Sequence, residues 1–315
     1  MVKHFRTFFI LFFLLGMSSV GLAFFSFNPS PGTYTYKTVQ KHRLKLDVYK
    51  TKYSLNAPVI VWLHGGGLIM GCRTDIAKWQ LKEYLEAGYT VISIDYRLAP
   101  ETKLSEIVSD LRDALGWIRT HGSQSLNIDP SRIAVIGHSA GGYLAQLSGA
   151  ILSPKPRAVI SFYGYGELTA KWYSTPAHLE QQKISRDQAE LAITKGPLSC
   201  PKDELAEKRM NYYLYLRQNG LWPSQVTENW NVTRDEELFF DYEPLRLVNS
   251  SYPPTLLLHG GADLDVPHSA LLKMARVMEK NQVPFKVISK PEWGHAFDYE
   301  ETRENNKFSS PFFSF

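Results

Sequence analysis

The 315-residue sequence has few cysteines and little net charge, and both shortages exclude classes of protein. Two Cys residues are too few for a disulfide-stapled scaffold or a zinc site of four thiolates. The 35 basic and 31 acidic side chains leave a formal charge of +4, which gives no electrostatic reason to expect nucleic-acid binding. A hydrophobic share of 44% is ordinary for a globular protein and argues against general disorder.

Charge is missing altogether between Arg6 and Lys37. The basic start, the apolar run at residues 7–15 and the small residues that follow have the order of a secretory signal peptide. We therefore expect residues 1–23 to be a signal peptide and the protein to be secreted or periplasmic. An uncleaved membrane anchor is the alternative, because the apolar character continues to Phe27 and about 20 residues span a bilayer. Membrane contact is expected only through this segment.

The two cysteines, Cys72 and Cys200, have two interpretations. They form one disulfide in an oxidising compartment, or they are two small unpaired hydrophobic residues. Their spacing does not decide between these, and no feature of the sequence indicates an oligomeric state.

Alternating strand-like and helix-like segments follow residue 33. Period-2 alternation at residues 34–40 and 44–49 predicts an antiparallel opening pair of strands. Short apolar runs predict further strands, buried on both faces of a sheet, at residues 59–63, 91–94, 133–136, 158–160, 255–258 and 285–288. Helical periodicity in the connecting segments predicts an α/β fold with a mainly parallel central sheet flanked by helices.

The alternation is interrupted once, from about residue 165 to residue 252, where no buried-strand pattern occurs. Segments 179–193 and 204–218 have helical character instead. We interpret residues 33–315 as one domain with a mostly helical cap inserted at about 165–252. The aromatic residues of this cap are expected to pack between its helices, with a role in lining a pocket as the alternative.

The strongest chemical signal is the sequence Gly-His-Ser-Ala-Gly at residues 137–141. It lies between a predicted strand and a helical segment, the strand–turn–helix context that a G-x-S-x-G nucleophile elbow requires. Glycine on both sides allows the strained turn and the close approach of strand and helix. Ser139 is therefore the candidate nucleophile.

A second signal is the sequence His-Gly-Gly-Gly at residues 64–67, directly after a predicted strand. Successive glycines allow backbone N–H groups to converge on one point, as a tetrahedral oxyanion needs. The candidate oxyanion donors are the N–H groups of Gly66, Gly67 and Ala140. For His64 we expect a role in holding the loop, since the general base should follow the nucleophile in the chain.

A base and an acid are available on two later loops. His295 follows the predicted strand 285–288, and two carboxylates, Asp263 and Asp265, follow the strand 255–258. Parallel strands bring these loops to the sheet edge that carries Ser139. His295 is suited to exchange a proton with Ser139, while a carboxylate on its other ring nitrogen fixes the tautomer.

These segments together resemble the α/β-hydrolase superfamily, and within it the esterases related to hormone-sensitive lipase and the feruloyl/acetylxylan esterase-like group. The matching motifs lie in the family's order over about residues 42–300: His64-Gly65-Gly66-Gly67, Asp95-Tyr96-Arg97-Leu98-Ala99-Pro100-Glu101, Gly137-His138-Ser139-Ala140-Gly141-Gly142, His259-Gly260-Gly261-Ala262-Asp263 with Val266-Pro267, and Gly294-His295. One departure is His138, where relatives of hormone-sensitive lipase usually carry Asp.

The resemblance implies a catalytic triad of Ser139, Asp263 and His295, with Asp263 preferred over Asp265. It implies a serine esterase or lipase that cleaves a small-molecule ester through an acyl-enzyme, with no cofactor and no metal. An amidase, formamidase or peptidase that uses the same triad is the alternative within enzymes. A catalytically inactive binding ectodomain is the alternative outside them.

Overall fold

The computed structural model describes residues 29–299 except 53–54 and 178–181. The expected signal peptide, residues 1–23, lies outside the described residues, as does the end of the expected domain. Within the described part of the chain, no helix has both the length and the apolar character that crossing a membrane requires.

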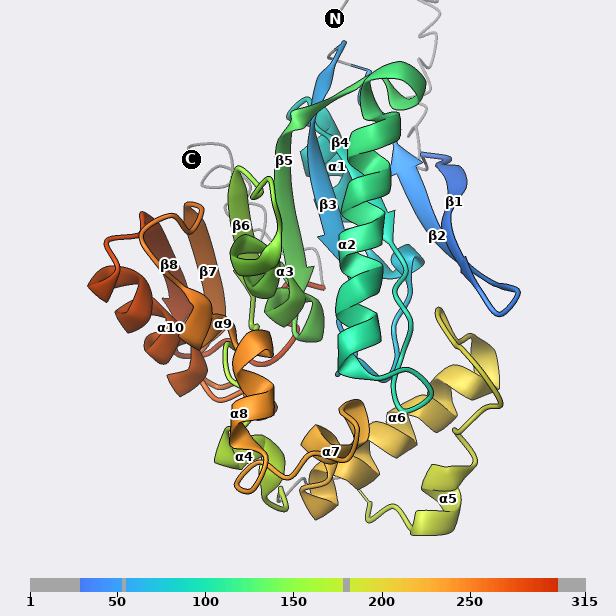
Figure 1. The fold of residues 1–315 in the computed structure, drawn as a ribbon, viewed down its shortest axis with the longest axis vertical. Helices are drawn as coiled ribbons and strands as arrows, with labels where there is room; N and C mark the ends of the chain where they lie inside the picture. Colours follow the sequence, from blue (N-terminus) through green and yellow to red (C-terminus); the bar gives the residue numbers. More distant parts are fainter. Residues whose placement is uncertain (1–28, 53–54, 178–181, 300–315) are drawn as a thin grey trace, which may run out of the picture.

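The described residues form one eight-stranded sheet in the order β1-β2-β4-β3-β5-β6-β7-β8 (Figure 1). Its strands are β1 (Gly32–Val39), β2 (His42–Tyr49), β3 (Ala57–Leu63), β4 (Thr90–Ile94), β5 (Ile128–His138), β6 (Ala158–Phe162), β7 (Thr255–Gly260) and β8 (Phe285–Lys290). Strand β2 is antiparallel to both β1 and β4, and the strands from β4 to β8 are parallel. The predicted parallel sheet and its antiparallel opening pair are confirmed.

The burial predicted for one strand, β8, is wrong. Strand β8 was expected to be buried on both faces, but it lies at the edge of the sheet. Lys286 and Val287 are exposed there, because β8 has a neighbouring strand on one side only. A short apolar run does not distinguish such an edge strand from a central one.

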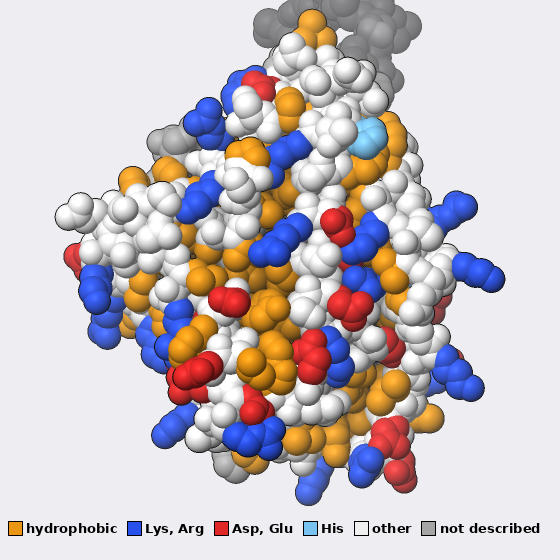
Figure 2. Space-filling model, viewed as in Figure 1, with side chains coloured by type: hydrophobic (Ala, Val, Ile, Leu, Met, Phe, Trp, Pro, Cys, Tyr) orange, Lys and Arg blue, Asp and Glu red, His pale blue; other side chains and the backbone are white. Residues whose placement is uncertain are grey.

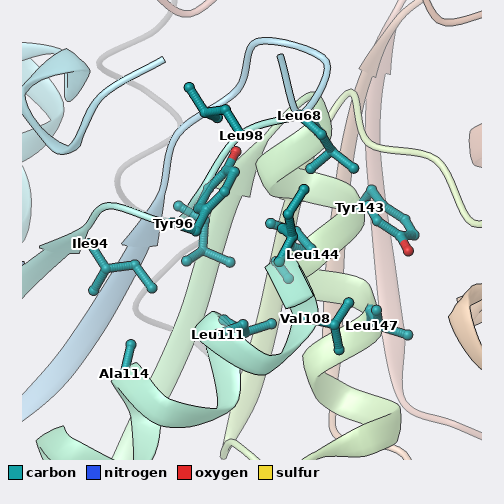
Figure 3. Close-up of a cluster of buried hydrophobic side chains, with 14 of the residues drawn as sticks. Leu68, Ile94, Tyr96, Leu98, Val108, Leu111, Ala114, Tyr143, Leu144 and Leu147 are labelled. Carbon is teal, nitrogen blue, oxygen red and sulfur yellow. The ribbon is translucent and has the colours of Figure 1, made fainter. Parts of the chain in front are cut away.

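Four helices connect the strands and cover the sheet: α1 (Lys78–Glu86), α2 (Leu104–His121), α3 (Ala140–Ile151) and α10 (Ser269–Lys280). Helices α2 and α3 share one face, where Val108, Leu111, Leu144 and Leu147 meet in a single buried cluster (Figure 3). Helix α1 packs against the other face. Each such buried side chain contributes about 1.5–3 kcal/mol, so these two layers fix the sheet that positions the site.

The segment between β6 and β7 carries one long helix and several short ones at the carboxyl ends of the strands (Figure 1). They are α4 (Lys171–Ser174), α5 (Arg186–Glu190), α6 (Asp203–Asn219), α7 (Trp222–Val226), α8 (Glu236–Phe239) and α9 (Pro244–Leu247). This segment also contains the short helical turn η3 (Phe240–Tyr242), and two similar turns lie outside it: η1 (Arg73–Asp75) after β3 and η2 (Gly122–Leu126) before β5. We call the α4–α9 segment the cap.

The helix predicted at residues 179–193 is shorter than expected. Of its described residues only α5 is helical, beginning at a capping box on Ser185. Leu191 and Ile193 are exposed, so the apolar positions that suggested a longer helix have no surface to pack against. Helix α6 contains the other predicted segment, residues 204–218.

A disulfide between Cys72 and Cys200 joins the cap to the loop that follows β3. The sequence had left this pairing open. The bond brings together residues separated by 128 positions, and it lies close to the His-Gly-Gly-Gly segment in the chain. Basic side chains are scattered over the face in Figure 2 and are not gathered into one patch.

Candidate active site

Ser139 occupies the sharp turn between β5 and α3. Its φ angle is +53°, in the left-handed region, and its N–H donates to the carbonyl of Phe162 at 2.9 Å. A β-carbon at Gly137 would overlap the carbonyl of Gly141, so the turn requires glycine there. The strained backbone therefore has a local cause in the sequence and presents the Ser139 hydroxyl at the carboxyl end of the sheet.

His295 lies between Ser139 and Asp263. Its Nε2 is 3.2 Å from Oγ of Ser139, and its Nδ1 is 2.8 Å from Oδ2 of Asp263. The other oxygen of Asp263 accepts the N–H groups of Asp265 and Val266, each at 2.9 Å. The structure thus brings together the three residues that the sequence suggested, in the order that proton transfer from a serine needs.

The charges in this group shift two pKa values in opposite directions. Burial raises the pKa of Asp263, but hydrogen bonds from His259 and His295 outweigh it and hold that pKa well below its usual range. Burial lowers the pKa of His295, but its hydrogen bond to Asp263 and the charge of Asp265 outweigh burial and leave the pKa raised. The arrangement favours an ionised carboxylate beside a histidine that accepts protons readily.

Asp265, the alternative acid, lies nearer to the other ring nitrogen of His295. The structure places its Oδ2 3.7 Å from Nε2 of His295, on the opposite side of the ring from Asp263. It accepts hydrogen bonds from Tyr213 and Arg217 of α6. Asp263 is therefore the carboxylate that contacts Nδ1.

The glycine loop after β3 borders the same turn. Gly66 and Gly67 line the cavity beside Ser139, with φ angles of +95° and +62°. A β-carbon on Gly65 would lie 3.3 Å from Cβ of Ser139, which shows how closely the loop approaches the nucleophile. Ala140, the third expected oxyanion donor, is the buried first residue of α3. Gly66 and Gly67 therefore border the same cavity as Ser139, and Ala140 follows Ser139 directly.

His64 is fully buried beneath this loop. Its ring stacks on Tyr96 with centroids 4.0 Å apart, and its Nδ1 lies 2.9 Å from the carbonyl oxygen of Gly65. Burial lowers the pKa of His64 to about 4, so its ring stays neutral at ordinary pH. Its contacts are with the loop and not with the reacting groups.

A cavity of about 540 Å³ opens above Ser139. Asp265 is the one carboxylate among its lining residues. The other lining residues are Gly66, Gly67, Met70, His138, Ser139, Tyr163, Met210, Tyr213, Leu214, Ala262, Leu264, Gly294, His295, Ala296 and Tyr299. The surface is mostly apolar, and α6 of the cap forms one wall.

Behind the cavity, Asp298 ties the histidine loop to the nucleophile turn. Its carboxylate lies 2.9 Å from Nε2 of His138 and accepts hydrogen bonds from Tyr163 at 2.7 Å and Gln80 at 2.5 Å. Burial raises the pKa of Asp298, but the neighbouring His138 and the hydrogen bonds from Tyr163 and Gln80 together outweigh burial and leave the pKa lowered. Asp298 belongs to none of the sequence motifs and was not predicted as part of the site. Its position three residues after His295 is the one feature of the sequence that indicates its closeness to the site.

Tyr213 is one of the cap aromatics for which the sequence predicted packing between helices, with pocket lining as the alternative, and it lines the cavity. Arg217 was missed as a part of the site, because no motif in the sequence marks it. Among the described residues, Cys72, Asp95 and Cys200 gather within 4.8 Å, as metal ligands would. Both sulfurs belong to the disulfide, so this set does not offer thiolate ligands.

Comparisons with known proteins agree with the fold. The model of the BD-FAE family matches residues 46–276. The polyketide synthase Preu6 of Preussia isomera is 29% identical over 300 residues, or 84% of this chain but 14% of the synthase. Esterase LipC of Mycobacterium tuberculosis is 27% identical over 258 residues, or 80% of this chain and 57% of LipC. This chain therefore spans only part of these relatives.

Among solved structures, an α/β-hydrolase superfamily protein from Enterococcus faecalis superposes with a TM-score of 0.70. The two are 22% identical, and the match covers 90% of this chain and 97% of that protein. The likeness shows that the fold is the α/β-hydrolase fold, as the sequence motifs implied.

Proposed function

The chain belongs to the BD-FAE family, α/β hydrolases of the esterase type, and we propose that it cleaves carboxylic esters through an acyl-enzyme formed on Ser139. The observation that carries this proposal is the continuous contact from Asp263 through His295 to Ser139, at 2.8 and 3.2 Å. A charged acid, a neutral base and a hydroxyl in this order are the parts that nucleophilic acyl transfer needs.

In the first step, Oγ of Ser139 attacks the ester carbonyl while Nε2 of His295 takes the hydroxyl proton. The N–H groups of Gly66, Gly67 and Ala140 stabilise the oxyanion of the tetrahedral intermediate. The intermediate collapses by breaking the bond to the alcohol oxygen, which receives the proton from His295.

In the second step, water replaces the alcohol. Nε2 of His295 takes a proton from the water as its oxygen attacks the acyl-enzyme. The second intermediate releases the carboxylic acid and returns the proton to Oγ of Ser139. Asp263 remains ionised and stabilises the imidazolium in both steps.

The lining of the cavity supports an uncharged small-molecule ester as substrate. Met70, Met210, Leu214 and Leu264 supply apolar contacts, and the single lining carboxylate is already paired with Arg217. Three of the cavity's lining residues, Met210, Tyr213 and Leu214, come from α6, so we propose that the cap selects the substrate.

Replacing Ser139 tests the reaction. We expect Ser139→Ala to abolish hydrolysis of nitrophenyl acetate and butyrate and to prevent labelling by a fluorophosphonate. The matched control is Ser148→Ala, because Ser148 is buried on α3 and its hydroxyl donates to the carbonyl of Ala145 on the same helix. Full ester turnover by Ser139→Ala contradicts the proposal. Folded wild-type protein that neither labels nor turns over esters favours a binding role, and preference for anilides or formamides favours the amidase alternative.

We further propose that residues 1–23 direct export. The Cys72–Cys200 disulfide supports this, since such bonds persist in oxidising compartments. N-terminal sequencing of the protein recovered outside the cytoplasm is the test. An intact Met1 contradicts cleavage and favours the membrane anchor.

A further inference from the structure

The mechanism above does not use Asp265, although Asp265 is the carboxylate nearest to Nε2 of His295. Its Oδ2 lies 3.7 Å from that nitrogen, the one that exchanges protons with Ser139. The side chain is one-quarter exposed, and it lines the cavity in which the substrate would bind. Asp263 occupies the Nδ1 side of the same ring, so the imidazole lies between two carboxylates.

Two side chains of α6 hold Asp265 in this place. The hydroxyl of Tyr213 donates to both carboxylate oxygens, at 2.8 and 2.9 Å. Arg217, one helical turn later, forms an ion pair with Oδ1 and donates to the backbone carbonyl of Asp265 at 3.2 Å. Three contacts from the cap therefore fix the carboxylate and restrict the Asp265 side chain to one rotamer.

Arg217 is itself immobilised. Its side chain is almost fully buried, and its guanidinium lies 5.4 Å from the ring of Trp172 and 4.9 Å from that of Tyr173. It also donates to the hydroxyl of Tyr213 at 2.8 Å. A buried Arg requires a partner charge, and Asp265 supplies it. Because the pair is fixed, the charge of Asp265 acts on His295 from a defined distance of 3.7 Å.

We propose that Asp265 is a second carboxylate of the active site, which stabilises the imidazolium of His295 from its Nε2 side, and that Tyr213 and Arg217 position it. The inference rests on the proposed ester hydrolysis and deepens it by giving the cap a part in the chemical step. Asp265 acts on the reaction through His295, by electrostatic attraction to the imidazolium, and is in this sense a positioning residue. Arg217 partly neutralises the charge of Asp265.

The groups around His295 come from several elements. Ser139 faces it from the β5–α3 turn, Asp263 and Asp265 from the loop after β7, the Tyr163 ring from the end of β6, and Asp298 from beyond that ring. Burial lowers the pKa of His295, whereas the three carboxylates raise it. Asp265 is the one of these carboxylates that also lines the cavity, and it can be neutralised without removing the hydrogen bond on Nδ1.

The test compares pH profiles of two variants that change opposite charges. In Asp265→Asn, the loss of negative charge should move the acidic limb of kcat/KM to lower pH and reduce kcat about tenfold, with KM within twofold. In Arg217→Met, the uncompensated carboxylate should move the same limb to higher pH. Asp265→Glu should restore part of kcat. A merely structural role predicts reduced activity with an unmoved limb in both variants, and that result overturns the inference.

A second measurement separates this inference from the proposed function. An NMR titration of the His295 ring in Ser139→Ala, with and without Asp265→Asn, requires no ester turnover. A lower midpoint in the double variant supports the inference, and an equal or higher midpoint overturns it. If Asp265→Asn does not fold, Tyr213→Phe keeps the ring but removes a hydrogen-bond donor from the Asp265 carboxylate. It should move the limb to higher pH, as Arg217→Met does, and an unmoved limb overturns the inference. Wild-type enzyme that lacks Ser139-dependent turnover contradicts the proposed function instead.

Discussion

The indole nitrogen of Trp222 donates a hydrogen bond to the carbonyl oxygen of Gly67 at 2.7 Å. Trp222 begins α7 of the cap, and Gly67 is one of the proposed oxyanion donors after β3. The ring of Tyr213 packs against the same glycine. The cap therefore supports the oxyanion loop directly, so substitutions in the cap should affect catalysis and not only substrate choice.

Trp222→Phe tests this support. The substitution leaves the buried Gly67 carbonyl without its donor, which costs about 1–3 kcal/mol. We expect kcat for a short ester to fall about tenfold, less than the roughly 10²–10³-fold loss that follows removal of an oxyanion-hole donor. Trp62→Phe is the matched control, because Trp62 is equally buried and its indole nitrogen has no hydrogen-bond partner among the described residues. Equal losses of kcat in both variants would contradict the interpretation.

Gly67→Ala tests the closeness of the contact. Residue 67 has a φ of +62°, and a β-carbon there would lie 2.6 Å from the Tyr213 ring. Left-handed backbone costs alanine about 1–2 kcal/mol, and the overlap adds about 1–3 kcal/mol. We expect a lower free energy of unfolding in urea and a large loss of kcat.

The control for backbone strain is Gly88→Ala. Gly88 also has a positive φ, +90°, but a β-carbon there would meet no described atom within 4 Å. The Gly88→Ala variant should lose only the free energy of unfolding that the left-handed backbone costs alanine, and its kcat should not change. If Gly67→Ala is no less stable and no less active than Gly88→Ala, the packing of the cap against Gly67 is not significant.

The sequence predicted those parts of the site that depend on local backbone chemistry. The turn at Ser139 and the glycines of the oxyanion loop have a short-range cause, since only certain residues adopt those angles. The partners of Asp265 do not, because Arg217 is 48 positions away and meets it only when the cap packs on the sheet. The limits of α5 were missed for a similar reason: burial, which depends on the whole fold, decides whether an apolar residue extends a helix.

The disulfide should stabilise the cap. Closing a loop of 128 residues between Cys72 and Cys200 is worth about 5 kcal/mol in the chain-entropy model. We expect Cys72→Ser/Cys200→Ser to unfold at a lower temperature, with weaker resistance of the cap to proteolysis. Reductant should lower the melting temperature of the wild type and leave that of the double variant unchanged. A melting temperature shared by all these forms would show that the bond does not contribute to stability.

His64 should make stability depend on pH. Its pKa is lowered to about 4 by burial, whereas an unfolded chain has a histidine pKa of about 6.5. As the pH falls from 6.5 towards 4, the unfolded state binds a proton that the folded state does not, so the free energy of unfolding decreases. At pH 4.5 this loss amounts to about 2.5 kcal/mol relative to pH 7.

The measurement is urea unfolding of the wild type and His64→Gln at pH 7 and pH 4.5. Glutamine does not titrate, so the variant should lose about 2.5 kcal/mol less than the wild type over this interval. The carboxylates that also titrate there are common to both proteins, and the difference isolates the histidine. An equal loss in both proteins would mean that the ring of His64 is already protonated in the folded state, which its stacking on Tyr96 and full burial oppose.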